Sequence, residues 1–244
     1  MEKQVVLEVK NLSKQFEKDG ASFPVLENVT FSLMEGEAFV LLGRSGCGKT
    51  TLLRCMGGFL KPEEGKVLLL GEKVEEPDTA CMMVFQDFNQ LFPWMTLKKN
   101  LIYVMKKAFP QMTSQEREEK ALVFLKKAGL EGFENQYPSE LSGGMKQRGA
   151  LARALVLAPK ILLMDEPFSS LDYLSRQTAR ETVQKMAEQT GCTVFLVTHD
   201  IEEAVVLGDR IGILDATNRI SKIFNNAEYE NKDLLVAELK AELL

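Results

Sequence analysis

An eight-residue motif constrains the fold of this chain more than any other feature. Residues 43–50 read Gly-Arg-Ser-Gly-Cys-Gly-Lys-Thr and fit G-x-x-x-x-G-K-[ST], the pattern of a phosphate-binding loop. Several backbone N–H groups must wrap the phosphates at once, and glycines allow this because they carry no Cβ atom. Lys49 is expected to supply a cation for the phosphates, and the Thr50 hydroxyl a ligand for Mg²⁺. The predicted phosphate-binding residues are Gly43, Arg44, Ser45, Gly46, Cys47, Gly48, Lys49, Thr50 and Thr51.

The segments on both sides of this loop favour the same interpretation. Residues 38–42 are a continuous apolar run, which predicts a buried strand. Residues 51–56 predict a helix that ends at Gly57-Gly58, and the positive end of its dipole would point at the phosphates. A flexible glycine-rich linker is the alternative, but linkers are not flanked by buried strands.

Composition and charge limit the class of protein. The chain has 244 residues, of which 45% are hydrophobic, so one α/β domain with an inserted lobe has ample core. The formal net charge of −5 argues against a nucleic-acid partner. No apolar run approaches 18 residues, so we expect no membrane-spanning helix, and a cytosolic location. The cysteines are expected to be reduced thiols because they form no C-x-x-C pair: Cys47, Cys55, Cys81 and Cys192.

Short apolar runs alternate with helical segments along most of the chain, which predicts a mainly parallel sheet. Alternation at residues 5–9 and 31–33 indicates a small antiparallel sheet before the phosphate-binding loop. Further buried strands are expected at residues 67–70, 81–85, 161–164, 193–197 and 211–214.

A helical lobe is predicted within this α/β core. Residues 87–146 contain no strand-like run, but residues 97–108 have helical spacing, and Thr113 to Glu116 form a capping box. Four segments are therefore expected: core residues 1–86 and about 150–225, a helical lobe at about 87–149, and a helical tail at 226–244.

Two acidic residues and the only histidine follow predicted strands. Asp165 and Glu166 come directly after one apolar run, and His199 follows another. The carboxyl ends of parallel strands share one edge of a sheet, where the phosphate-binding loop also lies. Asp165 would then hold Mg²⁺ through water, Glu166 would activate the attacking water, and His199 would donate to the γ-phosphate. Solvated carboxylates and a structural histidine are the alternatives.

A second candidate anion site lies at Ser142-Gly143-Gly144, where a helix is expected to begin. A helix N-terminus attracts anions, but this turn belongs to the predicted lobe, far in sequence from the phosphate-binding loop. One nucleotide cannot easily touch both sites within one molecule.

The phosphate-binding loop and the run Leu-Ser-Gly-Gly-Met-Lys-Gln-Arg at residues 141–148 together resemble the ATP-binding cassette family, specifically its transport ATPases. The resemblance extends from Val5 to about Ile213. It implies a RecA-like P-loop NTPase core of α/β class, ATP and Mg²⁺ as cofactors, and ATP hydrolysis. In that family, the phosphate loop of one subunit and the signature of the other sandwich ATP in a head-to-tail dimer.

The resemblance also implies roles for single residues. Phe16 stands where the family stacks an aromatic ring on adenine, although Phe23 lies nearby. Gln86 stands in the loop that reaches Mg²⁺ and the attacking water and couples to the membrane partner. Asp172 matches the loop that crosses the dimer interface, and His199 matches the switch histidine. The implied contacts to the other subunit's nucleotide are Ser142, Gly143, Gly144 and Gln147.

Three positions depart from the family pattern. Phe16 replaces the commoner Tyr, and Arg44 stands where Pro is frequent. Gly149 falls within a predicted helix, at a cost of roughly 1 kcal/mol relative to Ala.

Segments 91–97 and 165–172 are similar to importer ATPases for nitrate, sulfonates and taurine. This similarity implies a second ATPase subunit (a homodimer is expected), permease subunits and, indirectly, a solute-binding protein as partners, at the inner face of the cell membrane. Phe92 and Trp94 would suit a groove that grips a short permease helix, or they pack the lobe instead.

Other functions stay open from the sequence. A cassette ATPase of lipid export or of a membrane signalling complex would share every ATP-binding residue and differ in its partner. A kinase or GTPase fits less well, because residues 231–234 read Asn-Lys-Asp-Leu and fail the N-K-x-D pattern of a GTPase at the last position. The transported solute cannot be read from these residues.

Overall fold

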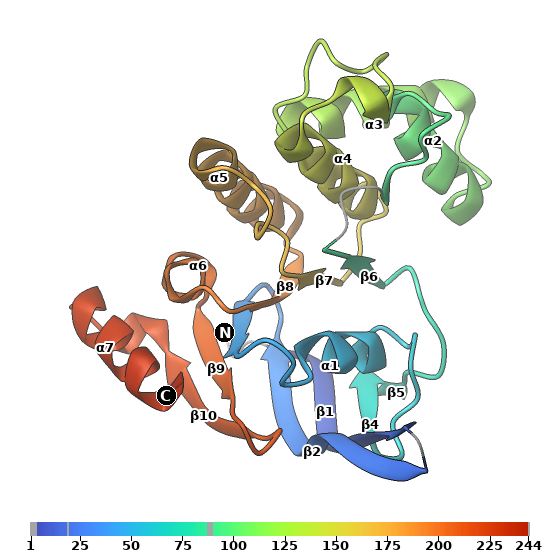
Figure 1. Cartoon of the computed structure of the whole chain (residues 1–244). Coiled ribbons are helices and arrows are strands. Elements are labelled where there is room, and N and C mark those ends of the chain that lie inside the picture. The colour runs from blue at the N-terminus through green and yellow to red at the C-terminus, as the bar shows by residue number, and fades with distance from the viewer. Residues whose placement is uncertain (1–3, 19, 87–89, 244) are drawn as a thin grey trace.

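The computed structural model describes residues 4–18, 20–86 and 90–243, and Figure 1 shows how their elements are arranged. A six-stranded sheet forms the centre, and five neighbouring strands run parallel, as the alternation of apolar runs and helices predicts. The sixth strand is antiparallel at one edge. In spatial order the strands are β10 (Ile220–Asn225), β9 (Arg210–Leu214), β3 (Ala38–Gly43), β8 (Thr193–Thr198), β7 (Ile161–Asp165) and β6 (Cys81–Val84).

Both faces of this sheet are covered, because its strands are apolar at successive positions. In β3, Val40 and Leu42 point to one core cluster, whereas Phe39 and Leu41 point to the other. A strand with both faces buried reads as a continuous apolar run, which is why residues 38–42 show no alternation.

A four-stranded antiparallel sheet covers one face. Two of its strands precede the phosphate-binding loop, as predicted, but the strand expected at residues 67–70 also joins this sheet, and only Val67 in it is buried. Phe31 of this sheet stacks on Phe39 and Phe195 of the central sheet, with ring centroids 5.4 and 5.5 Å apart. Helix α1 (Lys49–Met56) shares this cluster. In spatial order the strands are β2 (Ala21–Met34), β1 (Val5–Lys18), β4 (Glu64–Leu69) and β5 (Glu72–Lys73).

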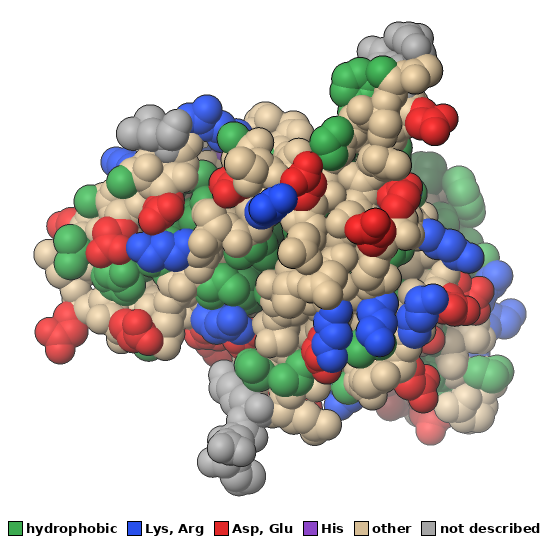
Figure 2. All heavy atoms as spheres, turned by 90° about the horizontal axis from the view of Figure 1, so that it is seen from below, with side chains coloured by type: hydrophobic (Ala, Val, Ile, Leu, Met, Phe, Trp, Pro, Cys, Tyr) green, Lys and Arg blue, Asp and Glu red, His purple; other side chains and the backbone are tan. Residues whose placement is uncertain are grey.

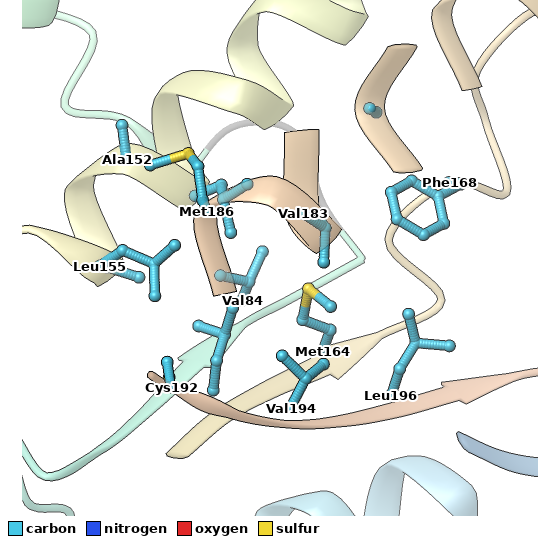
Figure 3. Close-up of a cluster of buried hydrophobic side chains, with 14 of the residues drawn as sticks. Val84, Ala152, Leu155, Met164, Phe168, Val183, Met186, Cys192, Val194 and Leu196 are labelled. Carbon is cyan, nitrogen blue, oxygen red and sulfur yellow. The ribbon is translucent and has the colours of Figure 1, made fainter. Parts of the chain in front are cut away.

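Helices cover the other face. Figure 3 shows Met164, Val194 and Leu196 of the sheet directed toward Val183 and Met186 of the helix at residues 173–190. The helices of this layer are α5 (Tyr173–Thr190), α6 (Ile201–Leu207) and α7 (Lys232–Leu243).

The predicted helical lobe forms beyond the β6 edge of the sheet, at the top of Figure 1. Thr113 caps its middle helix with the predicted capping box: its hydroxyl accepts from the Glu116 N–H, and the Glu116 carboxylate accepts from the Thr113 N–H. The expected boundary near residue 150 falls inside its last helix. The lobe helices are α2 (Leu97–Ala108), α3 (Ser114–Lys127) and α4 (Gly143–Leu155), and the 3-10 turn η2 (Pro138–Glu140) precedes α4. Outside the lobe, the 3-10 turn η3 (Asn226–Glu228) precedes α7.

Gly149 has a packing reason that its helix propensity does not reveal. A Cβ atom there would lie 2.8 Å from Leu97 Cδ2 and 3.2 Å from Leu91 Cδ1, both in the lobe core. The close approach of α4 to these side chains therefore offsets the propensity cost.

The outer surface carries mixed charge. Figure 2 shows the molecule from below, where Lys and Arg side chains lie among Asp and Glu side chains. Ion pairs such as Lys14 with Glu63 (2.6 Å) and Arg219 with Glu27 (2.9 Å) contribute to this pattern. In the described part of the chain, no helix is both long enough and apolar enough to cross a membrane.

Two leucines of α7 allow a direct test of how the tail is attached. α7 packs against α6 and β9, and its Leu239 is fully buried in the core, whereas Leu234 is 55% exposed. We expect Leu239→Ala to lower the free energy of unfolding by about 2–5 kcal/mol. Leu234→Ala should change it by less than about 0.5 kcal/mol. Urea unfolding of both variants measures this, and equal effects would contradict the placement of α7.

Candidate functional site

The phosphate-binding loop connects β3 to α1, as the sequence predicts. Its lysine is buried: Lys49 Nζ donates to the carbonyl oxygens of Gly43 (2.8 Å) and Arg44 (2.9 Å). Gly48 precedes the helix at φ 99°, so no side chain caps the first N–H groups of α1. The loop therefore curls around its own lysine and leaves helix N–H groups open to an anion.

The predicted Mg²⁺ ligands meet beside this loop. Thr50 Oγ1 donates to Asp165 Oδ1 at 3.1 Å, across 115 residues of sequence. Burial raises the pKa of Asp165, and this effect exceeds the lowering by the Thr50 hydrogen bond. In the described residues, no group of three or more His, Cys, Asp or Glu side chains could hold a metal.

Glu166 lies at the centre of the site. Its Oε1 is 3.6 Å from Lys49 Nζ, and its Oε2 is 3.0 Å from His199 Nδ1. Its backbone has φ 41°, in the left-handed region that a non-glycine residue occupies at a cost. The Glu166 N–H donates to the carbonyl of Val197 at 3.0 Å, which ties this conformation to β8.

Gln86 reaches the same edge of the sheet from β6. Val84 is paired with Met164, so Gln86 lies level with Glu166 along the strands. Its Nε2 is 3.4 Å from Ser169 Oγ in the turn after Glu166. The structure thus brings Lys49, Thr50, Asp165, Glu166, His199 and Gln86 to one place.

The Ser142 turn lies elsewhere, also as expected. Ser142 Oγ caps α4 by accepting from the Met145 N–H at 3.3 Å. A Cβ atom at Gly144 would lie 3.2 Å from Ser175 Cβ, and one at Gly143 would lie 3.7 Å from Leu171, so the turn packs beside the start of α5. Asp172 caps α5 there by accepting from the Ser175 N–H at 3.1 Å.

The two candidate anion sites are therefore separated within one molecule. α1 packs on one face of the central sheet and α4 on the other (Figure 1). Gln147 of α4 is only 4% exposed, and its Oε1 has no hydrogen-bond partner in the described ranges. This glutamine faces the packing between α4, α5 and Phe168.

The aromatic residue proposed for adenine lies at the tip of the β1–β2 hairpin. Phe16 pairs with Phe23 across the two strands, and both rings are exposed. Lys14 Nζ lies 5.3 Å from the centroid of Phe16, which orients that ring. Both rings thus stay available for stacking.

The loop residue Arg44 makes a contact that the sequence analysis missed. Its Nε donates to the Leu243 carbonyl in α7 at 2.9 Å, across 199 residues of sequence. A cavity of about 230 Å³ lies between Arg44, Cys47, the turn after β9 and the end of α7. Cys47 is a free thiol, as predicted, and burial raises its pKa, which disfavours the reactive thiolate.

Comparisons with known proteins agree with this geometry. The sequence pattern of the ABC transporter family matches residues 26–169. An uncharacterized ABC transporter ATP-binding protein of Methanocaldococcus jannaschii is similar at 45% identity, over 90% of this chain and 81% of that protein. The aliphatic sulfonates import ATP-binding protein of Bacillus cereus is similar at 37% identity, over 91% of this chain and 86% of that protein.

A solved structure matches in three dimensions. It is the dimeric post-hydrolysis state of an ATP-binding cassette bound to ADP and phosphate, with a TM-score of 0.79 and 35% identity. The match covers 90% of this chain and 98% of that chain. Because sequence pattern, relatives and fold agree, the chain belongs to the ABC transporter family and is an ATP-binding cassette that binds and hydrolyses ATP.

Proposed function

We propose that two copies of this chain close on two ATP molecules and drive import of a small anionic solute through a separate membrane permease. One observation carries the proposal: α1, which follows the phosphate-binding loop, and α4, which begins at the Ser142 turn, pack on opposite faces of the central sheet. A single molecule therefore offers two half-sites, and a head-to-tail pair would complete both. The dimeric state in which the similar cassette was solved supports this arrangement.

The loop fits a triphosphate. A Cβ atom at Gly48 would lie 2.5 Å from the Val25 carbonyl oxygen, and one at Gly43 would lie 2.6 Å from Cys47 Sγ. Only glycine allows this tight curl, which exposes successive N–H groups to the anion. Lys49 can exchange its bonds to the loop carbonyls for bonds to phosphate oxygens.

The donor set also fits Mg²⁺. Thr50 and Asp165 offer hard oxygen atoms, and Mg²⁺ is usually held by one or two protein groups together with phosphates and waters. Two protein oxygens are therefore sufficient, and we assign Thr50 and Asp165, with Gln86 beside them, to this ion. Mg²⁺ would neutralise charge on the phosphates during hydrolysis.

The remaining residues divide the chemistry between two subunits. Glu166 would act as general base on the attacking water, His199 would orient Glu166 and donate to the γ-phosphate, and Phe16 would stack on adenine. Nucleotide contacts from the other subunit are assigned to Ser142, Gly143, Gly144, Gln147 and Asp172. Gln147 is buried, so its contact requires a shift of α4.

These residue roles assign a function to each segment of the chain. We assign nucleotide binding to residues 1–86 and about 150–225, and partner binding to the lobe at about 87–149. The tail at 226–244 would support the loop through the Arg44 contact with Leu243.

An aromatic cluster on the lobe supports a membrane partner. Phe92 lies 5.5 Å from Trp94 and 5.2 Å from Tyr103 between ring centroids, and Arg153 lies over Phe92. Trp94 is 69% exposed, so the cluster is anchored at one end and open at the other. Such a surface suits a short permease helix at the inner face of the membrane.

The similarity to an aliphatic sulfonates import protein favours import of a sulfonate, nitrate or taurine type of solute, which a solute-binding protein would deliver. A cassette ATPase of a non-import system is the second candidate, because the more similar relative is uncharacterized. The permease with which the chain co-purifies decides between them.

Substitutions at Gly48 and Gly46 test whether the backbone of the phosphate-binding loop is as crowded as the structure shows. Both have positive φ, but a Cβ atom at Gly46 meets nothing within 4 Å, whereas one at Gly48 lies 2.5 Å from a carbonyl oxygen. Gly46→Ala should lower the free energy of unfolding by about 1–2 kcal/mol through backbone strain. Gly48→Ala should lower it by about 1–3 kcal/mol more through overpacking. Urea unfolding without nucleotide measures both free energies. Equal values for the two variants would contradict the tight backbone conformation of the loop at Gly48.

Glu166 and Lys49 test the chemistry. Glu166→Gln should keep wild-type ATP affinity, lose at least about 100-fold in hydrolysis rate, and accumulate an ATP-bound dimer in analytical ultracentrifugation. A Glu166→Gln variant that turns over at the wild-type rate would remove that residue from the mechanism.

Lys49→Ala should instead weaken ATP binding by about tenfold or more, because a charged hydrogen-bond donor is lost.

Trp94 tests the membrane partner. Trp94→Ser should leave the ATPase activity of the purified chain unchanged and weaken its complex with the permease by roughly tenfold or more, as loss of an interface hot spot does. Val206→Ala is the matched control, because Val206 is an exposed apolar residue on α6, outside the lobe. Quantitative pull-down from detergent-solubilised membranes measures both, and equal retention of the permease would exclude the cluster as its binding surface.

A further inference from the structure

We infer that Ser169 is a positioning residue that connects Gln86, and through it the aromatic cluster of the lobe, to the backbone of Glu166. The inference rests on the proposed function, because it concerns how the permease-facing loop reaches the general base. No role was expected for Ser169 from the sequence.

Ser169 holds the carbonyl side of Glu166. The Ser169 Oγ donates to the Glu166 carbonyl oxygen at 3.0 Å, and the Ser169 N–H donates to the same oxygen at 3.3 Å. On its other side, the Glu166 N–H is held by Val197. Glu166 has φ 41°, and such a strained backbone persists only where the surroundings fix it. Ser169 fixes the carbonyl side of this residue, as Val197 fixes its N–H side.

The same hydroxyl also holds Gln86. A serine hydroxyl can donate one hydrogen bond and still accept others. While Ser169 Oγ donates to Glu166, it accepts from Gln86 Nε2 at 3.4 Å. One oxygen atom therefore connects the end of β6 to the end of β7.

Gln86 is in turn tied to the lobe. The Gln90 side-chain amide forms two hydrogen bonds with the Phe85 backbone: its Nε2 donates to the carbonyl oxygen at 2.6 Å, and its Oε1 accepts from the N–H at 3.0 Å. Arg153 Nη1 donates to the Gln90 carbonyl at 2.6 Å, and the Arg153 guanidinium lies 5.2 Å from the centre of the Phe92 ring. A displacement of the aromatic cluster thus moves Phe85 and its neighbour Gln86.

This series of contacts ends at Ser169, where one hydrogen bond to Gln86 is long and the bonds to Glu166 are shorter. A pull on Gln86 by a bound permease would loosen or tighten the turn that holds Glu166. Ser169 therefore couples the binding of a permease at the aromatic cluster of the lobe to the orientation of the Glu166 carboxylate.

The neighbouring Ser170 offers a matched control. It is exposed, and its side chain makes no hydrogen bond within the part of the chain that the structure describes. Ser169→Ala and Ser170→Ala remove the same hydroxyl one residue apart, so only the position differs.

The test measures ATP hydrolysis by the full chain at saturating Mg²⁺ and varied ATP. We expect Ser169→Ala to lower kcat by roughly tenfold, since one hydrogen bond to the turn is lost, with KM for ATP and melting temperature close to wild type. Ser169→Thr should recover most of kcat, because the hydroxyl is restored. Ser170→Ala should hydrolyse ATP as wild type does.

A double-mutant cycle separates positioning from a general weakening of the fold. If Ser169 acts through Gln86, then Ser169→Ala in a Gln86→Ala background should cost clearly less than in wild type. Additive losses, or a wild-type kcat in Ser169→Ala, would overturn the inference. If wild type and Glu166→Gln hydrolyse ATP equally, the proposed function fails. If Glu166→Gln alone is inactive while Ser169→Ala is unaffected, only the present inference fails.

Discussion

The register of β3, β7 and β8 is the constraint on which the rest of the structure depends. Leu42 pairs with Thr198, and Asp165 pairs with Val197, so the three strands end at one level. Their next residues open the phosphate-binding loop, the Glu166 turn and the segment at His199. Apolar side chains on the two faces of each strand fill two separate core clusters, so a slip of one residue would exchange side chains between the clusters and scatter the site.

Two neighbouring carboxylates and a buried lysine lie at this edge of the sheet. Burial first, and then the neighbouring charge of Glu166, raises the pKa of Asp165, while Arg54 and Lys49 lower it to a smaller degree. The buried Lys49 thus pairs with Glu166 and affects Asp165 only weakly through its charge. A divalent cation beside Asp165 would reverse the effect of burial on that carboxylate, which is consistent with the proposed Mg²⁺ site.

Local signals made most of this architecture predictable. The glycine pattern, the apolar runs and the Thr113 capping box each act over a few residues, and all three predicted their elements correctly. β5 and β10 were missed because a two-residue strand and a short edge strand whose apolar residues do not alternate leave no periodic signal. The Arg44 contact with α7 and the Ser169 bridge were also missed, since both join segments that only tertiary packing brings together. The residue roles inferred from the family resemblance stay predictions.

The caps of the helices explain why the phosphate-binding loop and the Ser142 turn, rather than α5, suit an anion. α5 carries the Asp172 carboxylate at its N-cap, and hydrogen bonds from Ser175 lower the pKa of this group, so the positive end of the helix already faces a negative charge.

α1 and α4 begin instead with the neutral caps Gly48 and Ser142 and have no acidic residue in the first turn. The Ser142 hydroxyl accepts from Met145, which leaves its proton free to donate. α2 and α3 also have neutral caps, but Thr96 of α2 is buried, so an anion cannot approach it, and α3 carries the acidic Glu116 in its first turn. Of the described helices that have eight or more residues and an assigned cap, α1 and α4 therefore have an open and uncharged N-terminus. These two helices pack on opposite faces of the sheet. This is the pattern that two facing copies need to bind a triphosphate from both sides.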